Sequence, residues 1–414
     1  MNLEQTIQET EQHIQKKHQA VNTMVERNQE KVLRAFQTHR VSDSHFNPTT
    51  GYGYDDFGRD TLEAVYADIF RAEDALVRPQ LISGTHAITT ALFGVLRPGD
   101  ELLYITGEPY DTLEEVIGKN GGKDTGSLRD FGISYQSIPL KKDKVDLTEV
   151  EQAISEKTKV VAIQRSKGYA DRPSFPVDEI ERMIGAVRSI KEDVIVFVDN
   201  CYGEFVEAKE PLEVGADLIA GSLIKNPGGG IARIGGYLAG REDLIEQCSY
   251  RLTAPGLGKE TGASLNMLQE MYQGIFLAPH VVGEALKGAI FTAEFLDRLG
   301  FDTNPSSHAK RTDLIQSVNF ETAEQMIKFC QAIQQGSPVN SHVLPHPSPM
   351  PGYEDDVIMA AGTFIQGASL ELTADGPIRP PYTAFVQGGL TYAHVKIAVT
   401  QAVRKLMEEN ALSS

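Results

Sequence analysis

Short apolar runs alternate with helix-like segments between residues 80 and 240. The runs PQLISG, DELLYITG, ISYQSI, KVVAIQRS, DVIVFVDN, ADLIAGS and GGYLAG predict seven strands. Between several of them, apolar residues recur at helical spacing over 85–96, 112–119, 147–155 and 177–190. This alternation predicts an α/β fold with a seven-stranded, mainly parallel sheet that helices cover on both faces. Ligands of such sheets bind at the carboxyl ends of the strands.

The chain on either side of this region has other patterns. Ile7, Ile14 and Val21 lie seven residues apart and predict one or two amphipathic helices in an arm of residues 1–45. This arm packs either on a partner subunit or on the protein's own core. A long helical pattern ends near residue 300, and a mixed α and β segment follows. Since 414 residues exceed the size of a single core, we expect a large domain over 46–285 and a smaller α+β domain over 286–414.

Composition and charge exclude several classes of function. The net charge of −18, without a basic stripe, argues against nucleic acid as a partner. No run approaches the roughly 18 apolar residues of a membrane span, and the polar N-terminus resembles no signal peptide, so we expect a cytoplasmic protein. The three cysteines form no CxxC pair, which argues against a disulfide framework or a thiolate metal site. His342 and His346 flank Pro345 in a loop-like segment, and we expect no metal there.

Four strand ends carry residues suited to one ligand site. Ser83, Gly84 and Thr85 lead from the first strand candidate into a helix, whose free N–H groups suit a phosphate, although an ordinary Ser cap fits the same pattern. Tyr110 follows the next strand and either stacks on a planar ligand or packs in a turn. Asp199 ends an apolar strand, where it can match a protonated ring nitrogen or cap a loop.

The fourth strand end is SLIK, in which Ser222 precedes Lys225 by three residues. Lys225 leaves an apolar strand and is followed by three consecutive glycines, so it is predicted to emerge from the core into a flexible loop. Lys167 and Lys259 are rival lysines beside glycine, but neither has a serine three residues earlier. His86 follows the phosphate-like turn and either lies near a cofactor or caps the helix.

The order and spacing of these motifs resemble those of the fold-type I pyridoxal-phosphate enzymes. Ser-x-x-Lys follows the strand-ending Asp by 26 positions. Within this class the chain is similar to the cystathionine and methionine lyase branch, and most closely to the methionine gamma-lyase-like or aluminium-resistance proteins. The resemblance covers residues 46–395 and includes GYGYDDFGRDTLE, RSKGYADRPSF, RLTAPGLGKETGA, PMPGYEDDVIMAAGTFIQGASLELTADGP and PPYTAFVQGGLTYAH.

The resemblance implies pyridoxal 5'-phosphate as the cofactor and assigns a role to each strand-end residue. Lys225 would bind the cofactor covalently and later act as the base, Asp199 would pair with the pyridine nitrogen, and Tyr110 would stack on the ring. The phosphate would be held by Ser83, Gly84, Thr85 and Ser222. The large domain would be the cofactor-binding domain.

Two features of the lyases have only loose equivalents in this chain. Lyases place a Tyr and an Arg from the neighbouring subunit at the phosphate, for which Tyr52, Tyr54 and Arg59 are the candidates. They also carry an Arg for the substrate carboxylate in a strand that reads FVQGGLTYAH here and contains none. We expect Arg379, between prolines in DGPIRPPYTAF, to take that role, with Arg165 and Arg172 as rivals.

The resemblance therefore implies a carbon–sulfur lyase acting by β- or γ-elimination on a small sulfur amino acid such as cystathionine, cysteine or methionine. An aminotransferase uses the same residue types, and a pyridoxal-phosphate-binding, stress-related protein with little turnover is a third hypothesis. The protein is expected to be a homodimer or homotetramer with its sites at the subunit boundary.

Overall fold

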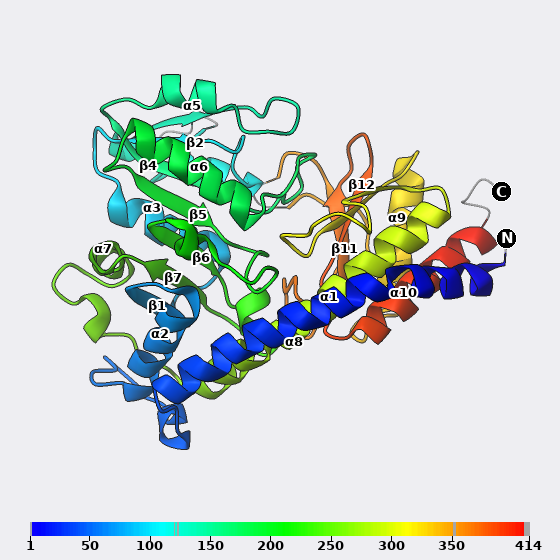
Figure 1. Cartoon of the computed structure of the whole chain (residues 1–414), viewed down its shortest axis with the longest axis horizontal. Helices are drawn as coiled ribbons and strands as arrows, with labels where there is room; N and C mark the ends of the chain where they lie inside the picture. The colour runs from blue at the N-terminus through cyan, green and yellow to red at the C-terminus, as the bar shows by residue number, and fades with distance from the viewer. Residues whose placement is uncertain (1, 120, 122–123, 351–352, 410–414) are drawn as a thin grey trace.

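The computed structural model describes residues 2–119, 121, 124–350 and 353–409, and its larger half is built on a seven-stranded sheet (Figure 1). The strands lie in the order β1-β7-β6-β5-β4-β2-β3. β2 to β6 run parallel to one another, and β7 is antiparallel to both β6 and β1. The predicted sheet is confirmed. Its strands are β1 (Asp74–Arg78), β2 (Glu101–Tyr104), β3 (Ser134–Ser137), β4 (Thr158–Gln164), β5 (Ile195–Asp199), β6 (Leu218–Ser222) and β7 (Gly236–Gly240).

Helices cover both faces of this sheet because the strands carry apolar residues on both faces, and each face needs a covering layer. Phe197 of β5 belongs to the core beneath α3 (Gly84–Val95) and α7 (Glu242–Leu252). Val196 and Val198 belong to the opposite core, with α2 (Phe57–Phe70) and α6 (Val177–Ile190). The short helices α4 (Asp111–Ile117) and α5 (Leu147–Ala153) complete the predicted α/β alternation.

The smaller half contains a five-stranded antiparallel sheet in the order β10-β11-β12-β9-β8. Helices α9 (Ala323–Gln335) and α10 (Tyr392–Glu408) pack with it around a second apolar core. The expected mixed α and β end of the chain is thereby confirmed. The strands are β8 (Asp302–Asn304), β9 (Gln316–Asn319), β10 (Val357–Ala360), β11 (Thr373–Pro377) and β12 (Thr383–Gln387).

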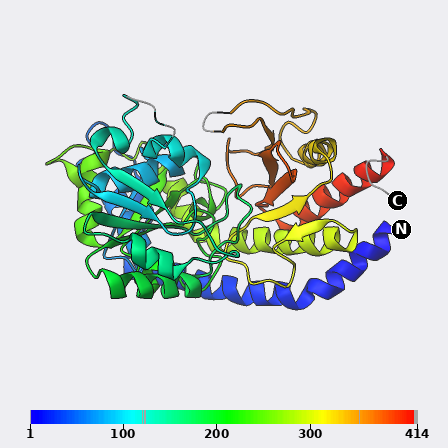
Figure 2. The ribbon, with the colours of Figure 1, turned by 90° about the horizontal axis from the view of Figure 1, so that it is seen from above.

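Two long helices join the halves. The predicted N-terminal arm is a single helix, α1 (Leu3–Thr38), which lies along α8 (Leu268–Arg298) and beside both halves (Figure 2). Ile14 enters the smaller core and Val32 the larger one, so α1 packs on its own chain. Close contact is possible at Gly283, where a Cβ would lie 2.3 Å from Cγ2 of Val25.

Helix α8 crosses from the larger core to the smaller one. Ile275 packs in the first and Phe295 in the second, so the proposed division at residues 285 and 286 falls within a continuous helix. Among the described residues, α8 is the one helix long and apolar enough to cross a membrane, yet most of its apolar stretch is buried inside the protein. It therefore has the character of a core helix.

The first strand was predicted too late in the sequence. PQLISG is not a strand; β1 is the preceding segment, Asp74–Arg78. Pro79 has no N–H group for a ladder hydrogen bond and follows the last strand residue. Leu81 alone turns into the core, whereas Ile82 is 67% exposed. Residues 79–82 form the turn that precedes Ser83, the N-cap residue of α3.

Candidate active site

A cavity of about 180 Å³ lies at the carboxyl ends of β4, β5 and β6, where the fold predicts a ligand. It is lined from four directions: the start of α3, the start of α4, the ends of the strands, and the loop after β6. Seven residues predicted from the sequence meet there: Ser83, Gly84, Thr85, Tyr110, Asp199, Ser222 and Lys225.

Lys225 is the cation of this cavity. It is half-buried, and its Nζ lies 4.1 Å from the centre of the Tyr202 ring. No hydrogen bond or ion pair reaches Nζ from the described part of the chain. Burial alone would lower the pKa of Lys225, but the groups of Cys201, Tyr202 and Asp199 outweigh it and raise the pKa. The amine therefore faces the cavity without a fixed partner.

Asp199 supplies the matching negative charge. It is the last residue of β5 and is 5% exposed, and its Oδ1 accepts a hydrogen bond of 3.1 Å from the Cys201 N–H group. Burial raises the pKa of Asp199, against the opposing influence of Lys225 and of the Cys201 N–H group. A cationic ring nitrogen in the cavity would offset the free-energy cost of burying the ionised Asp199 carboxylate.

The start of α3 and the end of β6 form a cradle suited to an anion. Ser83 caps α3 by accepting the His86 N–H group at 3.0 Å, as the capping interpretation of this turn predicts; the ligand interpretation stays a prediction. A Cβ at Gly84 would lie 3.3 Å from Cβ of Ser222, and only glycine leaves this corner open. The buried Ser222 hydroxyl has no hydrogen-bond partner. A ligand oxygen would satisfy it together with the free N–H groups of α3.

His86 does not line the cavity. Its Nδ1 accepts the backbone N–H of Ile82 at 3.3 Å, which supports the capping interpretation.

Tyr110 lines the cavity and contacts two further tyrosines that lie outside the lining. Tyr110, which precedes α4, shares a 2.5 Å hydrogen bond with the hydroxyl of Tyr353 from the smaller half. The ring of Tyr169 packs beside both, with ring centres 6.0 Å from Tyr110 and 5.7 Å from Tyr353. Burial raises the pKa of Tyr110 well above its usual value, so its hydroxyl keeps its proton.

Several residues of the site were missed from the sequence. Tyr202, beneath Lys225, has a left-handed backbone with φ of 70°, which no residue pattern indicated. Gln164 ends β4 and presents a buried Oε1 without a partner. Cys201 lines the cavity, and its position two residues after Asp199 was the only signal for it. Tyr353 lies 243 residues from Tyr110 in the sequence.

Some predicted residues lie elsewhere. Tyr52 and Tyr54 are 71% and 55% exposed and stack on each other, away from the cavity of their own chain. Arg59 is buried and donates to the backbone oxygens of Gly53 at 2.7 Å and Gly262 at 3.2 Å. It holds the loop that carries the two tyrosines.

The predicted substrate arginines are not in the cavity lining either. Arg165 is fully buried and pairs with Glu207 and Glu210, each at 3.2 Å. Its guanidinium is therefore already bound to two carboxylates in this structure, and its role toward a substrate stays a prediction. Arg379 pairs with Asp355 at 3.0 Å in a neighbouring pocket that Lys167 also lines. Arg172 is buried against backbone carbonyls, and its Nε has no partner.

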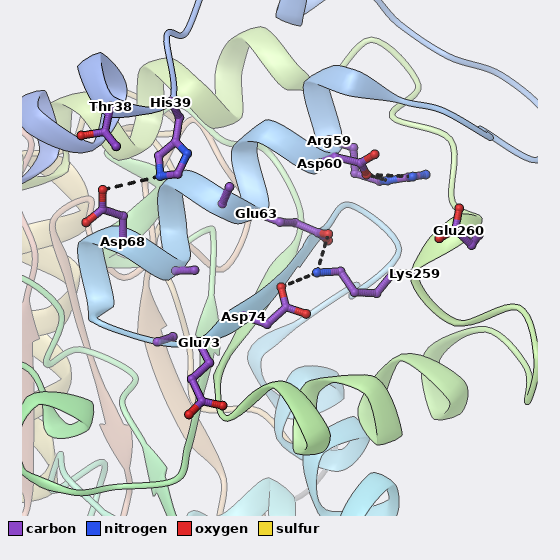
Figure 3. A pocket seen from close by; sticks show the side chains of 13 residues that line it. Thr38, His39, Arg59, Asp60, Glu63, Asp68, Glu73, Asp74, Lys259 and Glu260 are labelled. Atoms are coloured by element: carbon purple, nitrogen blue, oxygen red, sulfur yellow. Dashed lines mark hydrogen bonds and ion pairs between the residues drawn. The ribbon is translucent and has the colours of Figure 1, made fainter.

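A larger pocket, of about 540 Å³, is drawn in Figure 3. It shares no lining residue with the cavity. There Lys259 forms ion pairs with Glu63 at 3.3 Å and Asp74 at 2.5 Å. Lys259 is thus paired with two carboxylates. The other rival, Lys167, lies outside this pocket and is buried, with its Nζ 3.3 Å from the Ser317 hydroxyl. Among the three lysines considered, only Lys225 lines the cavity.

The comparisons with known proteins agree with this geometry. A sequence model of the methionine gamma-lyase family matches residues 3–407. The uncharacterized protein YnbB of Bacillus subtilis strain 168 is 65% identical over 411 residues, which are 99% of this chain and 98% of that protein. A solved structure from Listeria monocytogenes, named as a candidate cystathionine beta-lyase involved in aluminium resistance, has 62% identity and a TM-score of 0.95 over 97% of this chain and 99% of its own.

A more distant likeness defines the fold. The pyridoxal-5'-phosphate-dependent protein YhfS of Escherichia coli superposes with a TM-score of 0.61 at 16% identity, over 92% of this chain and 96% of its own. The architecture is that of the fold-type I pyridoxal-phosphate enzymes. Within that class, the chain belongs to the methionine gamma-lyase family, which makes it a member of a carbon–sulfur lyase family and confirms the resemblance seen in the sequence.

Proposed function

We propose that this protein is a pyridoxal 5'-phosphate-dependent lyase that cleaves the carbon–sulfur bond of a small sulfur amino acid such as cystathionine, cysteine or methionine. One observation carries the proposal: the unpartnered Lys225 amine shares a cavity with the buried Asp199 carboxylate and the unsatisfied Ser222 hydroxyl. An amine for the covalent bond, a carboxylate for the ring nitrogen and a hydroxyl donor for the phosphate are the three contacts that this cofactor needs.

The residues of the cavity fit the cofactor. Gly84, Thr85 and Ser222 would hold its phosphate, Asp199 its ring nitrogen and Tyr110 its ring face, with Lys225 as the covalent anchor. When bound, the cofactor withdraws electrons from the substrate's α-carbon and makes the α-proton acidic. Lys225, once released by the substrate, is positioned to take that proton. Tyr110, which keeps its own proton, is a donor for the departing sulfur.

The test is the variant Lys225→Ala, compared with wild type on a panel of sulfur amino acids. We expect wild type to release a 2-oxo acid together with a thiol, and the variant to lose this activity and the visible absorbance of the bound cofactor while staying folded. Pyruvate would indicate β-elimination and 2-oxobutyrate γ-elimination. Turnover that requires a 2-oxo acid acceptor would indicate an aminotransferase instead, and retained activity in the variant would refute the role of Lys225.

The substrate carboxylate needs a cation, and Arg379 is the proposed one. It is 45% exposed at its side chain, and its partner Asp355 is also accessible, so the pair can open when a substrate arrives. Arg379→Lys should lower kcat/KM by about 10- to 100-fold, as expected when a bidentate charge-assisted pair is lost, without changing the cofactor absorbance. Amines without a carboxylate should show no difference. A near-normal value would point to Arg172.

The subunit arrangement and location are also proposals. The exposed Tyr52 and Tyr54 lie far from their own cavity, which supports a homodimer, or a tetramer made of two such dimers, in which each subunit completes its neighbour's site. We expect the enzyme to work in the cytoplasm.

A further inference from the structure

A cluster of two histidines and a glutamate lies outside the candidate active site, at the seam between the two long helices. His13 comes from α1, Glu294 from α8, and His308 from the segment between β8 and β9. Their ligand atoms all lie within 4.8 Å of one another. Glu294 and His308 lie within one stretch of the chain, whereas His13 is 295 positions away from His308, so the packing of α1 completes the cluster.

The two imidazoles present the same ring nitrogen to each other. Nε2 of His13 and Nε2 of His308 are 2.8 Å apart, and the rings meet at 63° with centres 4.7 Å apart. Oε1 of Glu294 lies 3.9 Å from Nε2 of His13. Two ligands of a tetrahedral ion, each about 2.1 Å from it, are about 3.4 Å apart, a separation that lies between these two distances. The third separation, between His308 and Glu294, is at most 4.8 Å, so the two exposed imidazoles would have to rotate to reach that spacing.

Glu294 is held as a metal-bound carboxylate usually is. Ser307 donates to its Oε2 at 2.6 Å and Arg298 to its Oε1 at 2.7 Å, which fixes its orientation. Burial works to raise the pKa of Glu294, but the Ser307 hydrogen bond and the charges of His13 and Arg298 outweigh it and lower the pKa. The carboxylate is therefore ionised at neutral pH. Only 6% of the residue is exposed, so it forms the floor of the cluster.

We propose that His13, His308 and Glu294 form a binding site for a divalent transition-metal ion, with Zn²⁺ as the best match. Two imidazoles and one carboxylate suit Zn²⁺, Ni²⁺ and Cu²⁺, and they leave one position of a tetrahedron for water. The bound ion fastens α1 to α8 and to the segment that carries His308. Two cations lie close: Arg298, which also pairs with Glu9 at 3.4 Å, and Lys17, whose Nζ is 2.6 Å from the backbone oxygen of His308. They restrict the site to moderate affinity.

Calorimetric titration of the cofactor-loaded protein with ZnCl₂ tests this site. We expect one Zn²⁺ per chain, at least a 10-fold weaker affinity in His13→Gln and in His308→Gln, and a higher melting temperature with Zn²⁺ in wild type only. His346→Gln, which removes an exposed histidine outside the cluster, should bind as wild type does. Co²⁺ should give visible ligand-field bands in wild type that both cluster variants lose.

Two results would overturn the proposal. One is the absence of saturable binding by wild type, which would leave the pair of histidines as a hydrogen bond between two rings. The other is binding that His13→Gln and His308→Gln leave unchanged, which would place the ion elsewhere. Both histidines are surface residues, so their replacement tests the site without relying on a change in the core.

Discussion

At the scale of single residues, the pair of Tyr110 and Tyr353 connects the two halves of the molecule at the cavity. Their hydroxyls lie 2.5 Å apart, and the Tyr353 ring packs edge-on to Tyr110 with centres 6.4 Å apart. A phenol that donates a proton to a departing sulfur must point at it when the bond breaks. If Tyr110 is that donor, we expect Tyr353 to position its hydroxyl.

Tyr353→Phe removes this hydrogen bond and keeps the ring. We expect kcat to fall about 10-fold, the value of a neutral hydrogen bond, with little change in KM and none in cofactor absorbance. The pH dependence of kcat should also shift, because the environment of the Tyr110 hydroxyl changes. Tyr250→Phe, at a surface tyrosine bonded to Glu246, is the matched control. Equal kinetics for both variants would rule out the positioning role.

Glu204 is a second residue whose ionisation has a measurable consequence. It is fully buried, and Tyr237 donates to its Oε1 at 2.8 Å, while Oε2 has no partner. Burial raises the pKa of Glu204 from 4.5 to about 8. Between these values the unfolded chain releases the proton and the folded chain keeps it, so this group lowers the free energy of unfolding as pH rises.

Glu204→Gln imitates the protonated acid and should remove that pH dependence. Near pH 5 the variant and wild type should unfold at about the same urea concentration, and at about pH 8 the variant should be the more stable. Urea titrations at several pH values measure the difference. A constant difference over this range would show that Glu204 is ionised in the folded protein.

Some of these residues were recognisable in the sequence and others were not. Ser83, Asp199, Ser222 and Lys225 stand at the ends of apolar runs, and a parallel sheet brings such ends together at one edge. Tyr353 has no such signal, because its contact with Tyr110 depends on how the smaller half sits over the sheet. The choice among Arg379, Arg165 and Arg172 could not be made from the sequence for another reason: burial and existing partners decide what a guanidinium can bind, and the local sequence shows neither.

At the scale of elements, periodicity identified the helices and most strands, but it left the position of α1 open. Its seven-residue spacing of apolar residues fits a partner helix or the protein's own core equally well, and only the structure shows that α8 is the partner. The contact is close because Gly283 of α8 has no side chain where Val25 of α1 passes. The same absence of a Cβ explains why a weak helix former is tolerated inside α8.

Two glycine variants, one at this contact and one in another helix, should have opposite effects on the free energy of unfolding. Gly283→Ala places a Cβ 2.3 Å from Val25 and should lower the free energy of unfolding by about 1–3 kcal/mol. Gly185→Ala, in α6, meets nothing within 4 Å and should raise it by about 0.5–1 kcal/mol through helix propensity. Urea unfolding measures both. If Gly283→Ala is also stabilising, α1 is not fixed against α8 at this point.

At the scale of the whole molecule, we expect a second copy of the chain to complete the cavity. It would supply a further hydrogen-bond donor to the cofactor's phosphate. The loop with Tyr52 and Tyr54 is fixed in an exposed position, since Arg59 binds the Gly53 oxygen and Gly262 donates to the Tyr52 oxygen. A loop that is fixed in this way and exposes two stacked tyrosines is suited to contact another copy of the chain. It is the part of the molecule from which we expect the neighbouring site to be completed.

Mixing two inactive variants tests whether the site is shared. Tyr54→Ala should weaken cofactor binding although the residue lies outside its own cavity, and Lys225→Ala should be inactive by itself. When the two variants are unfolded and refolded together, about half of the dimers are hybrids, and each hybrid has one site with both Lys225 and Tyr54. About a quarter of the wild-type activity should therefore return, whereas either variant refolded alone should regain none. The absence of this recovery, or an active monomer in sedimentation, would show that Tyr54 does not complete a neighbour's site.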